Sequence, residues 1–197
     1  MIGRVARALG ILCGPPLVVL ALGSIVTVFG GQEIRAIDMT AFVVALAILP
    51  VLVVYGAYRA GYVSDLGLPE REPRVVVATI SLLSALTGVV ALMALGAAST
   101  LIAVAAGICL QLFVVDLITL RSKVSYHSAG VSSLAITGWY LGGMSLALPL
   151  GAIAIATGWS RWYLGKHTGR QVIAGFATSL ALVIWFVDLG GRFGLIR

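Results

Sequence analysis

The sequence predicts an all-α fold: a polytopic membrane helix bundle of six to seven transmembrane helices that forms a single integral membrane domain over residues 1–197. Two features of composition predict this class, since 60% of the residues are hydrophobic and only 10% are charged. Soluble domains carry about 25% charged residues. The third observation is the pattern, because apolar runs of roughly 20 residues, the length that crosses a bilayer, recur along the chain.

The predicted spans follow one another with short polar loops between them. Four runs have the length of one span, namely Leu9–Phe29, Ala41–Tyr58, Val75–Ala97 and Thr100–Leu120. The stretch from Ala129 to Trp159 is too long for one simple span, and Pro149 and Gly151 near its middle predict two shorter helices joined by a tight turn. A last span is predicted from Thr168 to Leu189. Leu12 is too large for a lipoprotein cleavage site before Cys13, so we expect an uncleaved first helix.

The basic residues are distributed unevenly over the loops. Seven crossings place the N-terminus and the loops at 59–74, 121–128 and 160–167 on one face, and every Lys and Arg except Arg35, Arg192 and Arg197 falls on that face. The positive-inside rule makes this face cytoplasmic. We therefore expect an integral protein of a prokaryotic plasma membrane. The net charge of +6 lies in short loops rather than on one polar surface, which excludes nucleic acid as a partner.

Three loops on the predicted cytoplasmic face carry the polar chemistry of the chain, and we define them as the active-site loops 59–74, 121–130 and 158–171. The second and third contain both histidines of the protein, His127 and His167, each beside Arg or Lys. Histidine suits proton transfer near neutral pH, and cations at a helix N-terminus suit a phosphate group. The alternative is that these residues are only the basic flanks of membrane helices.

Two motifs in these loops resemble the type 2 phosphatidic acid phosphatase family, whose signatures are shared by vanadium haloperoxidases. Ser160, Arg161 and His167 reproduce the Ser-Arg-x5-His part of the third signature, and Ser125 with His127 resembles the Ser-x-His end of the second. The resemblance implies that His167 is the nucleophile and that His127 is the general acid. It also implies phosphate binding by Ser125 and Arg161, with no metal and no cofactor.

The match to the family is incomplete at two positions. In the first signature Arg74 matches the arginine, but Gly67 stands where the family has lysine, so Arg71 or Lys123 is the candidate for the missing phosphate-binding charge. In the third signature Gln171 replaces an Asp that would hold the imidazole tautomer and stabilise the imidazolium, and a Gln can do only the first. Slower chemistry, a different orienting carboxylate and the loss of catalysis all remain open.

Asp116 is the candidate for that carboxylate, since it is an ionisable residue within the fourth predicted span. Such residues face the bundle interior and have a partner. Asp116 either orients a histidine or pairs with an arginine that holds the helices together. Gln171 and Asp116 are thus the two orienting candidates, and no carboxylate spacing indicates a Mg²⁺ site.

The resemblance implies a membrane lipid phosphatase, a phosphoric monoester or diphosphate hydrolase. It would remove a terminal phosphate from a phosphatidate, a lipid glycerophosphate or a polyprenyl phosphate through a phosphohistidine. The alternative is a non-catalytic lipid-phosphate binding or transport protein derived from that family, which the two departures favour. The expected partners are the lipid phosphate and the bilayer, and a homo-oligomer is compatible with both functions.

Overall fold

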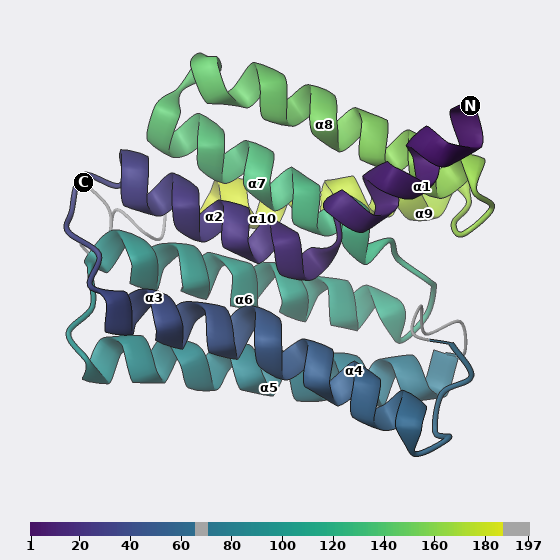
Figure 1. The fold of residues 1–197 in the computed structure, drawn as a ribbon, viewed down its shortest axis with the longest axis horizontal. Coiled ribbons are helices and arrows are strands. Elements are labelled where there is room, and N and C mark those ends of the chain that lie inside the picture. Colours follow the sequence, from purple (N-terminus) through teal and green to yellow (C-terminus); the bar gives the residue numbers. More distant parts are fainter. Residues whose placement is uncertain (66–70, 187–197) are drawn as a thin grey trace.

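The computed structural model describes residues 1–65 and 71–186, without the side chain of residue 71. Every regular element in these ranges is a helix, and the helices run lengthwise in one bundle (Figure 1). The all-α prediction is therefore confirmed for the described residues. In chain order the elements are α1 (Ile2–Leu12), α2 (Pro15–Phe29), α3 (Ala36–Val43), the π-helical turn η1 (Val44–Ile48), α4 (Leu49–Arg59), α5 (Arg71–Ala94), α6 (Ser99–Thr119), α7 (Tyr126–Gly142), α8 (Met144–Tyr163), α9 (Gly169–Ala177) and α10 (Leu180–Ile184).

Among the residues that the structure describes, three helical segments are long and apolar enough to cross a membrane. They are Ala36–Arg59, Glu72–Ala94 and Ser99–Thr119. A fourth candidate is the pair α1 and α2, if the two helices count as one bent span. These segments agree with an integral membrane protein.

The first predicted span, Leu9–Phe29, is broken near its start. Helix α1 ends at Leu12, and α2 begins at Pro15 after a bend of 60°. Pro15 has no N–H to continue the helix, and a residue before proline is driven out of the α conformation. Gly14 accordingly has an extended backbone, with φ −65° and ψ 149°. The proline pair at 15–16 therefore turns α1 away from the axis of α2.

The turn in the long stretch from Ala129 to Trp159 lies earlier than the sequence predicts. The prediction of a turn at Pro149 and Gly151 is wrong, because the chain reverses at Gly143 and Pro149 lies inside α8. Gly143 has φ 62° and ψ −154°, a backbone conformation that is open to glycine and strained for residues with a Cβ. The location of the turn therefore depends on the backbone conformation that Gly143 can adopt, and not on Pro149.

The last predicted span is also divided, at Thr178 and Ser179 between α9 and α10. Side chains from a neighbouring helix hold the break, because the Gln111 amide donates to the Thr178 hydroxyl at 3.0 Å and to the Ala129 carbonyl at 3.1 Å. Both Gln111 and Thr178 are buried, so this polar contact ties α6 to α7 and to the break. The predicted end of the span at Leu189 lies outside the described residues.

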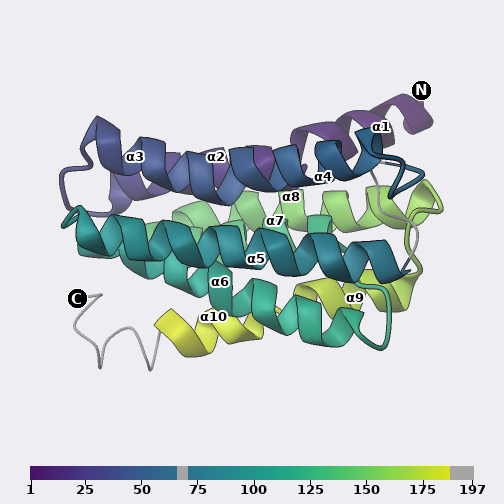
Figure 2. The ribbon, with the colours of Figure 1, turned by 90° about the horizontal axis from the view of Figure 1, so that it is seen from below.

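The helices run back and forth, so their connections gather at the two ends of the bundle (Figures 1 and 2). We call one the site end: α4, α6 and α8 stop there, α5, α7 and α9 begin there, and α1 lies alongside. The active-site loops 121–130 and 158–171 lie there in full. Loop 59–74 does so in its described part, since residues 66–70, Gly67 among them, are outside the described ranges. The α2–α3 and α5–α6 connections and the α7–α8 turn lie at the opposite end.

Candidate active site

The second and third active-site loops meet at the N-termini of α7 and α9. The Ser125 amide donates a hydrogen bond of 3.2 Å to the Gln171 carbonyl, which joins the residue before α7 to the first turn of α9. The close approach depends on Gly175, where an added Cβ would lie 2.6 Å from the Ser125 carbonyl oxygen and 2.9 Å from the Ser128 Cβ. A residue without a side chain at position 175 therefore lets the two helix N-termini lie together.

Ser125 is completely buried and caps α7. Its hydroxyl oxygen accepts hydrogen bonds from the Ser128 amide at 3.3 Å and from the Ser128 hydroxyl at 3.0 Å. Serine is a preferred residue at this position because its oxygen satisfies an N–H group that has no partner within the helix. Ser125, the expected phosphate ligand of the second motif, thus also fixes the start of the helix that carries His127.

His127 is held by a carbonyl group of α1. Its Nε2 lies 3.0 Å from the Gly10 carbonyl oxygen, and because a carbonyl only accepts, Nε2 is the nitrogen that carries the hydrogen. Burial, followed by the charge of Arg161, lowers the pKa of His127 to about 4, while the contact with Gly10 opposes this shift. The ring is therefore neutral at pH 7 when no anion is bound.

His167 lies near His127, and its Nδ1 is buried without a hydrogen-bond partner. Burial lowers its pKa to about 4, and the charges of Lys123, Arg161 and His127 act in the same direction. The neighbouring Gln171 side chain opposes the shift. Because charges influence one another most strongly at short range, these effects indicate that the two histidines, Lys123 and Arg161 lie near one another.

Two cations, Arg161 and Lys123, act on the histidines, and two more, Arg74 and Lys166, lie near Lys123. Burial, and then the charges of Arg74, Lys166 and Arg161, lower the pKa of Lys123. Arg161 also has a lowered pKa because of burial, and its Nε is buried without a hydrogen-bond partner. Within the described residues, Lys123, Arg161 and Lys166 form no ion pair with a carboxylate. Arg74 is buried as well. The side chain of Arg71, the alternative to Lys123, lies outside the described residues.

Gln171 has a structural role that was not recognised in the sequence. Its Oε1 accepts a hydrogen bond of 3.1 Å from the Thr168 amide, and the Thr168 hydroxyl accepts one of 3.4 Å from the Gln171 amide. This reciprocal pair is a capping box at the start of α9. The signal was present in the sequence as Thr-x-x-Gln before an apolar run. The capping box therefore fixes the position of the Gln171 side chain, which influences the pKa of His167.

Asp116 contacts a tyrosine and neither histidine. Its Oδ1 accepts a hydrogen bond of 2.9 Å from the Tyr126 hydroxyl, and its Oδ2 is buried without a partner. The two roles considered from the sequence were a histidine partner and an arginine partner. Tyr126 is instead the residue that Asp116 contacts, and it precedes His127 directly, so Asp116 acts on the first turn of α7.

Helix α1 contacts the site through two backbone carbonyl groups, although no sequence motif indicated that this helix belongs to the site. Besides the Gly10 contact with His127, the buried Ser160 hydroxyl donates to the Ala6 carbonyl at 2.8 Å. Contacts with backbone carbonyl groups have no sequence signature, because every residue carries one. In the described part of the chain, no group of three or more His, Cys, Asp and Glu residues is arranged to hold a metal ion.

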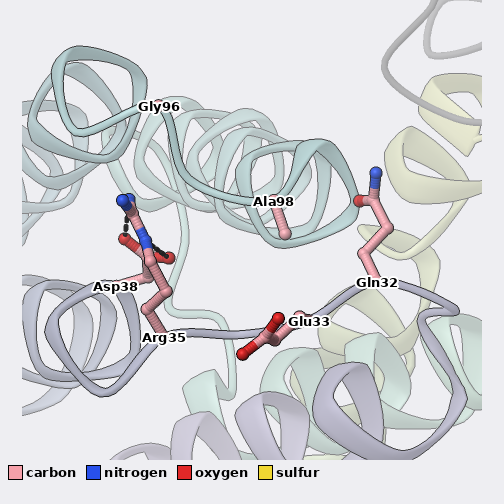
Figure 3. A pocket seen from close by; sticks show the side chains of 6 residues that line it. All are labelled: Gln32, Glu33, Arg35, Asp38, Gly96 and Ala98. Atoms are coloured by element: carbon pink, nitrogen blue, oxygen red, sulfur yellow. Dashed lines mark hydrogen bonds and ion pairs between the residues drawn. The ribbon is translucent and has the colours of Figure 1, made fainter.

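A polar pocket lies at the end of the bundle opposite the site end (Figure 3). It has a volume of about 370 Å³ and is lined by Gln32, Glu33, Arg35, Asp38, Gly96 and Ala98. Arg35 donates to both Asp38 oxygens, at 2.9 and 2.7 Å, and to the Leu95 carbonyl at 2.6 Å. This ion pair is internally satisfied and fastens the start of α3 to the end of α5. The pocket thus has a structural explanation.

No protein-family model, no curated protein and no solved structure matches this chain.

Proposed function

We propose that this protein is an integral membrane phosphatase that removes a terminal phosphate from a lipid phosphate. The substrate class is a phosphatidate, a lipid glycerophosphate or a polyprenyl phosphate. One observation carries the proposal: two histidines with pKa values of about 4 share one site with Arg161 and Lys123, beside the N-termini of α7 and α9. This arrangement is unfavourable when empty, and a phosphate dianion would relieve it.

The chemistry assigned to each side chain follows from this arrangement. The neutral His167 ring attacks phosphorus with a nitrogen lone pair, an N–P bond forms, and the P–O bond to the lipid breaks. Protonated His127 gives its proton to the departing oxygen. Water then attacks the phosphohistidine while neutral His127 takes a proton from it, and inorganic phosphate leaves. Arg161, Lys123, Arg74 and the Ser125 hydroxyl would hold the phosphate oxygens during both steps.

The protonation states need a bound anion. Without one, a pKa of about 4 leaves His127 neutral at pH 7, which is the wrong form for a general acid. A phosphate dianion in contact with the ring raises that pKa because it stabilises the imidazolium. The substrate therefore supplies the charge that prepares His127, whereas the neutral His167 ring donates its lone pair to form the bond to phosphorus.

The membrane arrangement belongs to the same proposal. Six to seven crossings with the site end in the cytoplasm would place the site at the level of the lipid headgroups. Arg and Lys residues are common in cytoplasmic loops at the headgroup level, which agrees with the basic residues of the site end. A lipid phosphate can then present its headgroup to the histidines while its tail stays in the bilayer.

A non-catalytic lipid-phosphate binding or transport protein is the second candidate, and one observation favours it. Gln171 takes the place of the family's carboxylate and is engaged in the capping box of α9. Neither histidine contacts a carboxylate in the described part of the chain. Binding needs only the cations and the helix N-termini, so it would survive without an orienting carboxylate.

The test is release of inorganic phosphate from a panel of lipid phosphates by the purified protein in detergent, with a chelator present. The phosphatase proposal expects release from at least one member, and none from the His167→Ala protein. Binding of a lipid phosphate without release across the panel would establish the second candidate. Release at an unchanged rate by His167→Ala would overturn the mechanism.

A further inference from the structure

We infer that helix α1 is a positioning element of the site, in which Gly10 sets the orientation of His127 and the location of Arg161. This inference rests on the proposed function for its catalytic consequence, but its geometric part can be tested without turnover. It assigns a role to a segment that lies far in sequence from every phosphatase-like motif.

The first contact fixes the His127 ring. The Gly10 carbonyl lies 3.0 Å from Nε2, so Nε2 is committed to donating, and Nδ1 is the nitrogen that remains to exchange a proton with a ligand. In a general acid, the group that binds one ring nitrogen sets the tautomer and the direction of the other. Here a main-chain carbonyl would orient the ring and fix its tautomer, as a carboxylate does for many active-site histidines.

The Gly10 carbonyl is available because of the bend between α1 and α2. In a continuous helix it would accept from the amide of Gly14, four residues on. The Gly14 amide instead donates to the Ile11 carbonyl at 3.1 Å, and the next residue, Pro15, has no N–H. The proline pair that ends α1 therefore leaves the Gly10 oxygen without an intrahelical donor, and His127 occupies it.

The second contact locates Arg161. A Cβ built on Gly10 would lie 3.1 Å from the Arg161 Nη1 and 3.9 Å from the Ser160 hydroxyl oxygen. The guanidinium group therefore packs directly on the α1 backbone. One turn earlier, the fully buried Ala6 accepts the Ser160 hydroxyl at 2.8 Å. The small-residue face of α1 thus contacts the start of the third motif as well as the general acid of the second.

The test uses a matched pair of substitutions on one helix. Gly10→Ala adds a methyl group against Arg161, whereas Gly3→Ala adds the same group where nothing lies within 4 Å. We expect Gly10→Ala to weaken binding of inorganic phosphate, measured by calorimetry, and to lower lipid phosphate turnover by roughly tenfold to a hundredfold, the cost of small misplacements in active sites. Gly3→Ala should match the wild type in both. Equal behaviour of the two variants would overturn the role of Gly10.

A second measurement observes the unaltered protein and does not depend on turnover. Nitrogen-15 NMR of labelled histidine at pH 7 should show His127 as the neutral tautomer with hydrogen on Nε2, with assignment by comparison with His127→Gln. A hydrogen on Nδ1 would overturn the inference even if the protein is an active phosphatase. The expected tautomer in a protein that releases no phosphate would support the positioning geometry and count only against the proposed function.

Discussion

The amide of Ser125 donates a hydrogen bond of 3.2 Å to the carbonyl oxygen of Gln171. These residues are the first position of one phosphatase-like motif and the last position of the other. The bond fixes the N-terminus of α7, which carries His127, against the N-terminus of α9, which follows His167. Five predictions test this arrangement and the chemistry proposed for it.

The contact between α7 and α9 should depend on Gly175. In Gly175→Ala the new methyl group would meet the Ser125 carbonyl oxygen at 2.6 Å, so the helices must separate. We expect a loss of about 1–3 kcal/mol in the free energy of unfolding, the usual cost of overpacking, in denaturant titrations in detergent. Gly169→Ala is the control in the same helix, because nothing lies within 4 Å of its added Cβ. Equal stability of the two variants would contradict the close approach.

Lys123 should destabilise the empty protein and help the occupied one. It is partly buried among Arg74, Lys166 and Arg161, so Lys123→Gln removes like-charge repulsion and should raise the unfolding temperature without ligand. The same change should weaken inorganic phosphate binding by roughly tenfold, about 1.4 kcal/mol. Arg121→Gln in the same loop is the control, since Arg121 is exposed. An Lys123→Gln protein that binds phosphate as tightly as wild type would remove Lys123 from the site.

The stability of the empty protein should fall as the pH drops from 6.5 toward about 4. The folded-state pKa values of His127 and His167, about 4, lie below the ordinary 6.5. Between about pH 4 and pH 6.5 the unfolded chain therefore binds more protons than the folded protein. The contribution of the two histidines to the free energy of unfolding is complete above pH 6.5 and is lost as the pH falls toward 4. Unfolding temperatures followed by tryptophan fluorescence would show the slope. Bound phosphate should reduce the slope because it raises both pKa values. A slope unchanged in the double variant His127→Gln, His167→Gln would assign it to other groups.

A carboxylate at position 171 should raise the pKa of His167. Gln171→Glu keeps a side chain that suits the capping box and places a negative charge beside the imidazole, which stabilises the imidazolium. If neutral His167 is the nucleophile, the acid limb of the pH–rate profile should move to higher pH. Gln171→Ala separates the capping role of residue 171 from its effect on His167. It should lower the free energy of unfolding by about 1 kcal/mol, as the loss of a cap does, and it adds no charge beside the imidazole. An acid limb that stays in place in Gln171→Glu would mean that residue 171 does not act on the His167 ring.

The two histidines should respond differently to the leaving group. His167→Ala should abolish turnover of every phosphate ester and leave phosphate binding largely intact, because the attack is lost and the cations remain. His127→Ala should lose roughly 10²–10⁴-fold with a lipid alkoxide as leaving group and far less with an activated aryl ester, which needs no proton. Parallel assays on both substrate types measure the difference. Equal losses on both would exclude His127 as the general acid.

Much of the architecture was predictable from hydropathy. The runs at Ala41–Tyr58, Val75–Ala97 and Thr100–Leu120 correspond to helices within a few residues, because a long apolar segment has few alternatives to helix in a bilayer. The breaks were less predictable. The turn at Gly143 and the division at Thr178 depend on which backbone groups find partners from other helices, and such contacts lie far apart in sequence.

The candidate site shows the same division. The sequence by itself determined which side chains with phosphate chemistry exist, in the motifs around His127 and His167, and that the intervening spans return them to one end of the bundle. Only the tertiary structure decided that Gln171 closes a capping box, that Asp116 contacts Tyr126, and that the Gly10 carbonyl of α1 holds His127. The physical reason is that motifs record side-chain identity. Backbone carbonyl groups and close approaches at glycine are common to every sequence, and they acquire a role only when the helices pack.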